Sequence, residues 1–493
     1  MIVQPFMQAI APSPMAMTFL TLRNNYRPHH HQHDSSSRLF ATKSSPLDNF
    51  FDDPYSANVK DGTATSSPAA ATSESESESD TNTGERTRRV RYNGKYPRDF
   101  GDKYKELSGD EATVQKVLNK GMTPAGRHVP ILMKECLHHL GLDLLDVDNR
   151  EGPTFYVDCT LGYGGHSSQV LKRLLGDKNK SKGNRLLGFD RDPIEIVKAT
   201  ERLQQIVHDH DSQLDTNPVM TVNRNFREVR SYLETNSDGA GAGLGQVTAL
   251  LADLGLSSMQ IDDAARGFTY KREGPLDMRM AGNDCNSTTE TAHDLLSRIT
   301  VKQFTKMLQE NSDEEHAAVI AQAVLGGVLG SPSKKKKQPM VVAKDIPSTT
   351  VELANVVRNA VRPLISPPPP KKQSEDDPPR RDSPKVKKQL DSTVARVMQA
   401  IRIEVNSEFE SLEELMNDLP HILAPGGRAV VLTFHSGEDR RVKKAFKTGF
   451  NNGVYSSWSR DVVRPTAEER RDNPRSSCCK LRWVVRSDSA IVE

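Results

Sequence analysis

Residues 154–166 read TFYVDCTLGYGGH, an apolar run that ends at Asp158 and is followed by three glycines. The apolar run predicts a strand over Thr154–Cys159, and the pattern after the glycines predicts a helix over Ser167–Leu175. Glycines between a strand and a helix let backbone amides approach a bound ligand closely. The stretch therefore predicts a ligand-binding turn, and a tight turn without a ligand is the competing interpretation while the motif stands alone.

Further strands are predicted beyond this turn, at 186–189, 219–222 and 247–252. The first of them is followed by Asp190 and the last by Asp253. Short apolar runs that alternate with amphipathic helical patterns are typical of a parallel sheet covered by helices. The sequence thus predicts an α/β fold with a Rossmann-like sheet.

The alternation of strands and helices stops after the third of these runs and resumes near the carboxyl terminus. Residues 262–405 carry helical patterns, which predict a helical subdomain inserted into the sheet domain. Four consecutive lysines and a proline-rich charged stretch predict disordered loops at 331–338 and 363–390 within it. The sheet domain would then be a core in two parts, 98–261 and 406–493, the second with a basic C-terminal segment.

The amino-terminal region has the composition of a targeting segment. Its first 33 residues contain no Asp or Glu and lead into a Ser-rich, basic stretch, which is typical of transit peptides. Residues 1–45 are therefore predicted to direct the chain to an organelle, either mitochondrion or plastid, and an ordinary disordered leader is the alternative. Residues 46–97 are rich in Ser, Thr, Ala and Glu and predict a disordered linker.

Composition argues against several classes of protein. The net charge of +2 does not by itself indicate a partner. The five cysteines form no C-x-x-C pair, so the sequence predicts neither a metal site nor a disulfide framework. No stretch approaches the roughly 18 apolar residues that a membrane-spanning helix needs, so no membrane span is predicted.

The turn and the strand ends predict a cofactor that contains adenosine. In nucleotide-binding β-α-β units, an acidic side chain after the second strand accepts hydrogen bonds from ribose hydroxyls, and Asp190 holds that position. No lysine follows the glycines as it does in phosphate-binding P-loops. Phe226 follows the third strand, where its ring could stack on adenine. These features fit a dehydrogenase nearly as well as a methyltransferase.

Motifs spread over most of the chain distinguish these two classes. They are HVPIL at 128–132, DCTLGYGGHS at 158–167, FDRDP at 189–193, ADLGLSS at 252–258, DDAARGF at 262–268, GPLDMRM at 274–280, QAIR at 399–402, FHS at 434–436 and NPR at 473–475. In order and rough spacing they resemble the bacterial ribosomal RNA small-subunit methyltransferase H family, from about Arg127 to Arg486. The GPLDMRM string is highly specific, and the targeting composition fits an organellar member of that family.

The resemblance implies a class I S-adenosylmethionine-dependent methyltransferase fold with an inserted helical subdomain. It further implies S-adenosyl-L-methionine as cofactor and methyl transfer to the exocyclic N4 amine of a decoding-centre cytidine in small-subunit ribosomal RNA. By motif position, the residues implied to line the cofactor site are Gly164, Gly165, His166, Asp190, Phe226, Asp253 and Gln260. The sequence departs from the family pattern at Cys159, Met259 and Gly437, where the family usually has glycine, proline and leucine.

The chemistry of a cytosine amine indicates which side chains are candidates for catalysis. Its nitrogen is a poor nucleophile because the lone pair is delocalised into the ring, so the enzyme must orient the amine and accept a proton. Asp253 at its strand end, Ser257 and Ser258 just beyond it, and His435 after the strand predicted over 429–434 are the candidate catalytic residues. An aspartate that only caps a helix is the competing interpretation for Asp253. The reaction needs no metal.

RNA contact is predicted for the basic C-terminal segment. From Arg428 to Arg486 there are 14 Lys or Arg against 6 Asp or Glu. The basic residues and aromatic residues singled out for contact with phosphates and unpaired bases are Arg440, Arg441, Lys443, Lys444, Lys447, Tyr455, Trp458 and Trp483. The predicted partner is small-subunit ribosomal RNA or the assembled small subunit, and both a monomer and a homodimer remain open.

Two other functions remain as alternatives. A ribosome-assembly factor could keep this fold and bind RNA without transferring methyl groups, and the departures from the family pattern keep that alternative open. A DNA amino-methyltransferase would usually carry a Pro-Pro-aromatic string after the fourth-strand acid, where this chain has Leu254-Gly-Leu-Ser257.

Overall fold

The protein is described here by a computed structural model. The described residues are 130–143, 152–176, 183–210, 217–236, 243–282, 290–326, 328–329, 341–342, 345–366 and 382–488. The predicted transit peptide (1–45), the predicted linker (46–97) and the predicted loop at 331–338 lie outside these residues.

Helices and strands alternate along the first half of the described chain. The helices are α3 (Met133–His139), α5 (Gly165–Leu175), α6 (Pro193–His210), α7 (Val229–Thr235), α8 (Ser258–Asp262), α9 (Ala292–Arg298), α10 (Val301–Ser312), α11 (Ala317–Leu325), α12 (Thr350–Ile365), α13 (Pro384–Asn406), α14 (Glu408–Ile422), α15 (Ser436–Asn451) and α16 (Ala467–Asp472). The strands are β1 (Phe155–Asp158), β2 (Arg185–Phe189), β3 (Val219–Val222), β4 (Val247–Asp253), β5 (Val328–Leu329), β6 (Val341–Val342), β7 (Leu423–Thr433), β8 (Tyr455–Trp458) and β9 (Lys480–Arg486). Short 3₁₀ helices lie at Phe226–Glu228, Ala264–Arg266 and Pro474–Cys478. None of the helices in the described part of the chain is long and apolar enough to cross a membrane.

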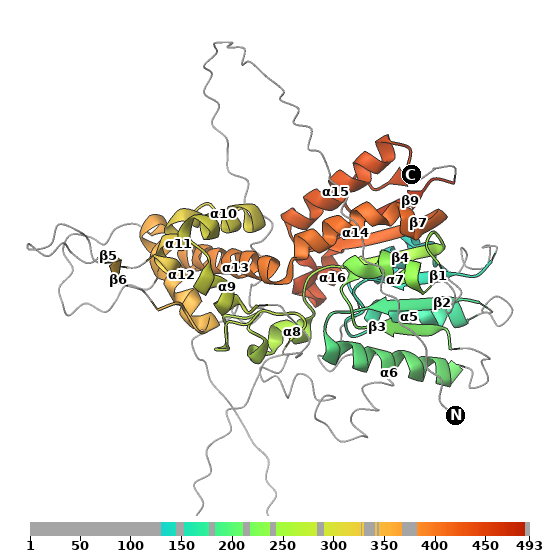
Figure 1. Cartoon of the computed structure of the whole chain (residues 1–493), viewed down its shortest axis with the longest axis horizontal. Coiled ribbons are helices and arrows are strands. Elements are labelled where there is room, and N and C mark those ends of the chain that lie inside the picture. The colour runs from blue at the N-terminus through green and yellow to red at the C-terminus, as the bar shows by residue number, and fades with distance from the viewer. Residues whose placement is uncertain are drawn as a thin grey trace, which may run out of the picture. The chain divides into compact units, whose positions relative to one another are not determined.

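Seven of the described strands form one sheet in the order β3-β2-β1-β4-β7-β9-β8 (Figure 1). The pairs from β3 to β7 are parallel, whereas β9 runs antiparallel to both of its neighbours. Among the described residues, β5 and β6 pair with each other, outside this sheet. The sheet order, together with the helices between β4 and β7, confirms the predicted fold class: a Rossmann-like class I methyltransferase sheet with an inserted helical subdomain.

The two faces of the sheet are buried by different helices because side chains alternate along each strand. Tyr156 of β1 packs with residues of α3, α5 and α6 in one core cluster. Its neighbours Phe155 and Val157 belong to a second cluster with residues of α7, α14 and α15. The sheet is therefore covered on both faces, as a largely parallel sheet requires.

The inserted helices have a hydrophobic core of their own. It is built from α9 to α13 and includes Phe268, Leu276 and Met278, which precede α9 in the chain. Four of these helices begin at a hydroxyl side chain that accepts a backbone hydrogen bond: Thr291, Thr300, Thr349 and Ser383. Such caps satisfy amides that have no partner within a helix, so the sequence itself sets where these helices begin.

The structure shortens one of the loops that the sequence predicts. α12 continues to Ile365, past Pro363, and α13 begins at Pro384, so the predicted loop at 363–390 is helical at both ends. The strands β8 and β9 were also not predicted. In β9, Lys480 and Arg482 interrupt the apolar run by which a strand is predicted. Both are nevertheless buried in the strand, where they form ion pairs with Asp439.

Candidate active site

A cavity of about 290 Å³ lies at the carboxyl-terminal edge of the sheet. Parallel strands bring their carboxyl ends to one edge, and β1, β2 and β4 are neighbours there. Of the residues implicated by sequence, the cavity is lined by Gly165, His166, Asp190, Phe226, Asp253, Ser257, Ser258 and Gln260. Thus most of the predicted cofactor and catalytic residues, which come from distant parts of the sequence, meet in one cavity.

The glycine turn has the backbone geometry that its sequence predicts. Gly162 and Gly164 have φ values of 50° and 76°, in the left-handed region that favours glycine. Gly164 is the N-terminal cap of α5, and its amide donates to the carbonyl of Leu161 at 2.7 Å. Gly164 itself is absent from the cavity lining, so it shapes the turn while Gly165 faces the cavity.

Asp190 fastens the glycine turn to the end of β2. Its Oδ2 accepts the amide of Gly162 at 2.6 Å, and its Oδ1 accepts the amide of Asp192 at 2.8 Å. Burial raises the pKa of Asp190 to about 6, against the effect of these two amides. A carboxylate has lone pairs beyond those used by two amides, so Asp190 can still accept a ribose hydroxyl.

Asp253 presents an unsatisfied carboxylate oxygen at the cavity. Its backbone amide donates to Thr160 Oγ1 at 2.6 Å, which fixes the end of β4. Its buried Oδ1 has no hydrogen-bond partner among the described residues. Burial raises the pKa of Asp253 to about 6, the charge of His166 lowers it, and the carboxylates of Asp158 and Glu438 raise it further. An unpaired buried acceptor is costly, and the cap of α8 is Ser257, so the Asp253 carboxylate is available to a ligand.

His166 lies between Asp253 and the segment before α3. Its Nε2 is 3.0 Å from the carbonyl oxygen of Ile131, which can only accept, so this nitrogen carries a proton. Its Nδ1 is 3.6 Å from Asp253 Oδ2, too far for a direct hydrogen bond. The imidazole is thus held against the cavity wall with its second nitrogen toward Asp253.

Ser257 and Gln260 form a capping box at the start of α8. Ser257 Oγ accepts the amide of Gln260 at 3.1 Å, and Gln260 Oε1 accepts the amide of Ser257 at 3.0 Å. The Ser257 hydroxyl is therefore engaged in the helix cap. Ser258 makes no hydrogen bond through its side chain to another described residue and lines the cavity, as does Met259, which stands where the family usually has proline. Ser257 keeps the proton of its hydroxyl to donate, whereas the hydroxyl of Ser258 is free both to donate and to accept.

Phe226 lines the same cavity as the acidic strand ends. It begins a short 3₁₀ helix whose cap, Asn225, accepts the amide of Arg227 at 3.1 Å and donates to Ser411 of α14 at 3.0 Å. The Phe226 ring is partly buried against the core beneath α14 and forms part of the cavity lining. This position allows its exposed part to contact a flat ligand group.

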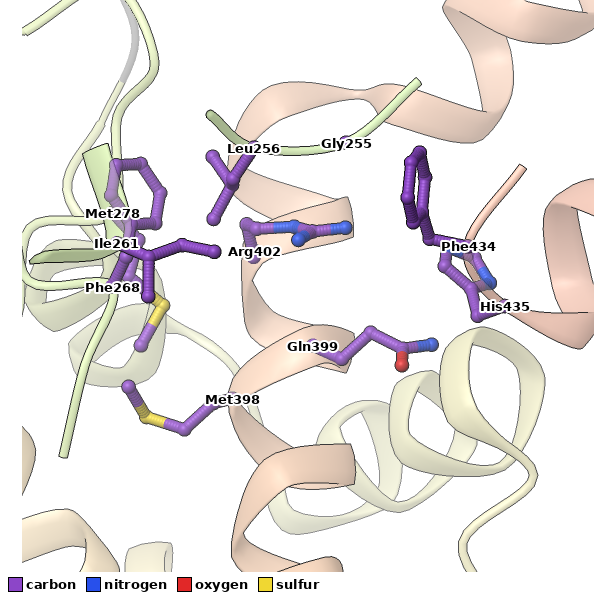
Figure 2. Close-up of a pocket in the computed structure, with 10 residues that line it drawn as sticks. All are labelled: Gly255, Leu256, Ile261, Phe268, Met278, Met398, Gln399, Arg402, Phe434 and His435. Atoms are coloured by element: carbon purple, nitrogen blue, oxygen red, sulfur yellow. The ribbon is translucent and has the colours of Figure 1, made fainter. Parts of the chain in front are cut away.

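His435 does not line the cavity that contains Asp253. It lines a smaller cavity of about 30 Å³ that has Gly255, Leu256, Ile261 and Phe434 in common with the larger one. Figure 2 shows Gln399 and Arg402 pointing from α13 toward Phe434 and His435. That volume holds about two water molecules and no nucleobase.

Glu438, which was not predicted from sequence, connects these two cavities. It is 3% exposed, it lines the larger cavity, and its Oε1 lies 3.1 Å from His435 Nε2. Burial alone would raise the pKa of Glu438, but His435 and the amide of Phe434 together hold it below its ordinary value. A signal was present in the sequence, since Glu438 stands three residues after His435 in a capping-box pattern.

One group of side chains near this point has ligand atoms close enough to hold a metal ion. Atoms of Glu408, His435 and Glu438 lie within 4.8 Å of one another. However, Arg402 makes a two-pronged ion pair with Glu408 at 2.8 and 2.9 Å, and His435 faces Glu438. Both carboxylates therefore already have a nitrogen partner, which favours ion pairing as the role of this group.

The structure corrects much of the predicted RNA-binding surface. Tyr455 is 3% exposed and packs against Phe446, so it cannot stack on a base. Trp483 stacks on His139, with ring centroids 5.0 Å apart. Trp458 is partly buried against the core beneath α15. Two of the three aromatic residues therefore serve packing within the protein.

The basic residues of this segment divide into paired and unpaired groups. Arg440 pairs with Asp313, and Arg441 pairs with Glu413. The exposed cations Lys443, Lys444 and Lys447 on α15 have no ion-pair partner among the described residues. These three lysines are the part of the predicted surface that remains available to phosphates.

Comparison with known proteins identifies a family for the chain. Residues 125–487 match the model of the MraW methylase family. The chain is 37% identical over 404 residues to "Ribosomal RNA small subunit methyltransferase H 1" of Agathobacter rectalis, which covers 81% of this chain and 98% of that relative. It is 38% identical to "Ribosomal RNA small subunit methyltransferase H 2" of Alkaliphilus metalliredigens, which covers 82% of this chain and 98% of the relative.

Proposed function

The chain belongs to the MraW methylase family, and from that premise we propose that it methylates the exocyclic N4 amine of a cytidine in the small-subunit ribosomal RNA of an organelle. Its cofactor is S-adenosylmethionine, and ribosomal RNA methylation is the activity that the family and the relatives' names support. The choice of the cytidine N4 atom and of the compartment is our proposal.

The residues of the large cavity fit this cofactor. S-adenosylmethionine combines an adenosine with a positively charged sulfonium, and it supplies an electrophilic methyl group when bound. The cavity lining includes the acidic residues Asp190, Glu195 and Asp253. Glu195 Oε2 and Asp253 Oδ1 are buried acceptors without a hydrogen-bond partner among the described residues. Glu195 pairs with Lys198 through its other oxygen, Oε1, whereas Asp253 has no cationic Lys or Arg partner in the described part of the chain, so Asp253 best suits a ligand that brings a positive charge and hydroxyl donors.

Asp253 is the observation that carries the proposed chemistry. A carboxylate whose pKa is about 6 is ionised near neutral pH, yet it is basic enough to accept a hydrogen bond or a proton from an amine that is losing one. Its unpartnered Oδ1 needs no other bond to be broken first. Ser258 lines the same cavity and offers a hydroxyl that can orient the amine.

The target base must reach this cavity from an RNA strand. A paired base has to leave its stack before its amine can enter an enclosed site, and phosphates on either side must then be held. Lys443, Lys444 and Lys447 on α15 provide exposed positive charge for that purpose. The acid-free, Ser-rich leader supports an organellar address, because this composition is typical of transit peptides.

Methyl transfer from labelled S-adenosylmethionine tests this proposal directly. The full-length protein is incubated with bacterial small ribosomal subunits, with their naked RNA or with duplex DNA, and methylated nucleosides are identified after digestion. We expect N4-methylcytidine in RNA from the wild type and at least a hundredfold less from Asp253→Ala. Asp391→Asn is the matched control, since Asp391 is a partly buried carboxylate paired with Arg358 in the inserted helices.

Each alternative function gives a distinct result in this assay. An assembly factor would bind small subunits while the wild type leaves no label in their RNA. A DNA amino-methyltransferase would label the duplex. Label in RNA on any atom other than N4 of cytidine would keep the enzyme class and overturn the proposed target. Methylcytidine mapping in organellar small-subunit RNA after gene disruption tests the compartment.

A further inference from the structure

Asp192, two residues after Asp190, joins three parts of the protein. It is 1% exposed, and its Oδ1 accepts two backbone amides at the start of α6. Its Oδ2 accepts Gln260 Nε2 at 2.9 Å and Arg266 Nη1 at 2.8 Å. Its own amide donates to Asp190 Oδ1. Asp192 lies in residues 190–192, which directly follow β2 and are called the cofactor turn. It ties this turn to Gln260 of α8 and to Arg266, which lies between α8 and the inserted helices.

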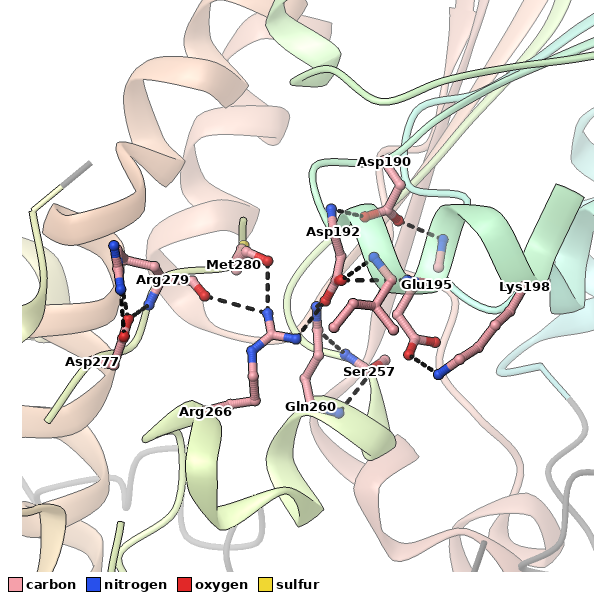
Figure 3. Close-up of polar contacts among 12 residues, drawn as sticks. Asp190, Asp192, Glu195, Lys198, Ser257, Gln260, Arg266, Asp277, Arg279 and Met280 are labelled. Carbon is pink, nitrogen blue, oxygen red and sulfur yellow. Dashed lines mark hydrogen bonds and ion pairs between the residues drawn. The ribbon is translucent and has the colours of Figure 1, made fainter. Parts of the chain in front are cut away.

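Arg266 extends this connection to a segment that lines the cavity. Besides Asp192, its guanidinium donates through Nη2 to the carbonyl oxygens of Arg279, at 3.3 Å, and Met280, at 2.7 Å (Figure 3). The Arg266 side chain is 15% exposed, so these contacts are largely shielded from water. A planar guanidinium can donate in several directions at once, which a lysine ammonium at this position could not reproduce.

Arg191 reaches the same segment by a second route. Its Nη1 donates to the carbonyl oxygen of Asn406 at 2.7 Å. Asn406, 1% exposed, accepts the amide of Met280 at 2.8 Å and donates to the carbonyl of Met278 at 2.8 Å. Two consecutive residues of the cofactor turn therefore hold residues 278–280. Arg191 acts through Asn406, and Asp192 acts through Arg266.

Residues 278–280 include one strained backbone conformation, and two of their side chains line the cavities. Met278 has a φ of 62°, a left-handed conformation that costs a residue other than glycine about 1 kcal/mol or more. Met278 lines the smaller cavity and Met280 lines the larger one. Such a conformation persists because surrounding contacts fix it, and here those contacts begin at the cofactor turn.

We propose that Arg191 and Arg266 are positioning residues that couple the cofactor turn to residues 278–280, so that cofactor binding tightens the binding of RNA. The inference rests on the proposed function. A ligand that orders Asp190 also orders Arg191 and Asp192, and through them the cavity wall that the target base must contact. Coupling of this kind is reciprocal, so bound RNA tightens the cofactor by the same factor.

The test measures a coupling factor, which is a ratio of two affinities. Binding of bacterial small ribosomal subunits to the full-length protein is measured with and without saturating S-adenosylhomocysteine, the demethylated cofactor. We expect the cofactor product to tighten subunit binding at least fivefold in the wild type. In Arg266→Lys this factor falls to less than twofold, while the variant still binds S-adenosylhomocysteine on its own. In Arg191→Lys the factor falls likewise, and because Arg191 lines the larger cavity the affinity for S-adenosylhomocysteine falls as well.

The matched control is Arg358→Lys, which alters another partly buried arginine of the inserted subdomain. Arg358 pairs with Asp391 and lines neither cavity. Its coupling factor should equal that of the wild type. A purely structural role would weaken both binding reactions and leave their ratio unchanged, so the ratio separates positioning from loss of fold.

The possible failures of the two proposals are distinguishable. A wild-type coupling factor of one, or an unchanged factor in both arginine variants, overturns the positioning role while methyl transfer remains intact. Absence of S-adenosylhomocysteine binding by the folded wild type overturns the proposed function and this inference together.

Discussion

At the scale of single residues, the site is defined by carboxylates whose surroundings are poor in compensating charge. Asp190 and Asp253 both have a pKa of about 6, and burial is the largest cause for each. Sequence position alone identifies both as strand-end acids. The difference between them is tertiary, since Asp190 accepts two backbone amides whereas Asp253 Oδ1 has no partner among the described residues.

We expect methyl transfer to increase as the pH is raised through about 6, because Asp253 must be ionised to accept a proton from the amine. Asp190 titrates in the same range and would weaken cofactor binding at low pH. Single-turnover rates with saturating cofactor therefore isolate Asp253 from Asp190. A rate that stays constant between pH 5 and pH 8 would exclude Asp253 as the acceptor.

Asp253→Asn should stabilise the protein at pH 8 while abolishing methyl transfer. The folded pKa of about 6 lies above the ordinary 3.8, so protonation favours the folded state below the ordinary value and this contribution is lost as the pH rises through about 6. The asparagine removes the cost of the buried charge, which is no more than about 3 kcal/mol. Thermal unfolding should show a higher midpoint for the variant at pH 8 and equal midpoints near pH 4. A variant that is less stable at pH 8 would contradict this account.

At the scale of elements, close backbone contacts set the path of the chain between β4 and the inserted helices. Gly267 follows Arg266 with a φ of 75°. A Cβ atom there would lie 2.4 Å from the carbonyl oxygen of Pro275, which no side chain can accommodate without movement of the backbone. The amide of Met278 donates to the carbonyl of Arg266 across this contact. Gly267 thus allows residues 278–280 to lie beside Arg266.

Gly267→Ala should destabilise the protein by clearly more than Gly282→Ala. Gly282 has a similar φ of 65°, but a Cβ atom there would meet nothing within 4 Å. The Gly282 variant therefore incurs only the left-handed backbone cost, about 1 kcal/mol. The Gly267 variant incurs that cost and must also displace backbone. Urea unfolding of both variants gives the comparison, and equal losses would show that the close contact adjusts freely.

At the scale of the whole molecule, burial decides which basic residues of the C-terminal segment can contact RNA. Lys480 and Arg482 are buried in β9 and pair with Asp439, although the charge count places them with the surface cations. In contrast, Lys443, Lys444 and Lys447 are exposed on α15, which covers one face of the sheet. The usable positive charge is therefore more localised than the sequence indicates.

Replacing Lys443, Lys444 and Lys447 together by glutamate should weaken binding to small-subunit RNA and reduce its salt dependence. Each lost phosphate contact lowers the slope of log affinity against log salt by about 0.7 to 0.9. Lys172→Glu is the control, because Lys172 is exposed on α5, which covers the opposite face of the sheet. Filter binding over a range of salt concentrations measures both quantities. An unchanged slope in the triple variant would place the RNA elsewhere.

The sequence by itself determined the parallel strands of the sheet, the glycine turn and the acids at the strand ends, because these depend on local periodicity and on residues close together in the chain. Strands at 186–189, 219–222 and 247–252 could be predicted from apolar runs alone, and Asp190 and Asp253 follow directly from where those runs stop.

Only the tertiary structure decided which polar groups have partners. It buried Tyr455 and Arg482, removed His435 from the cavity of Asp253, and joined Arg266 to Asp192, 74 residues away. Burial and long-range hydrogen bonding depend on how elements pack, and no local pattern encodes the distance between two side chains from different elements. For that reason the acids that line the cavity could be predicted from the sequence, whereas their hydrogen-bond partners in distant elements could not.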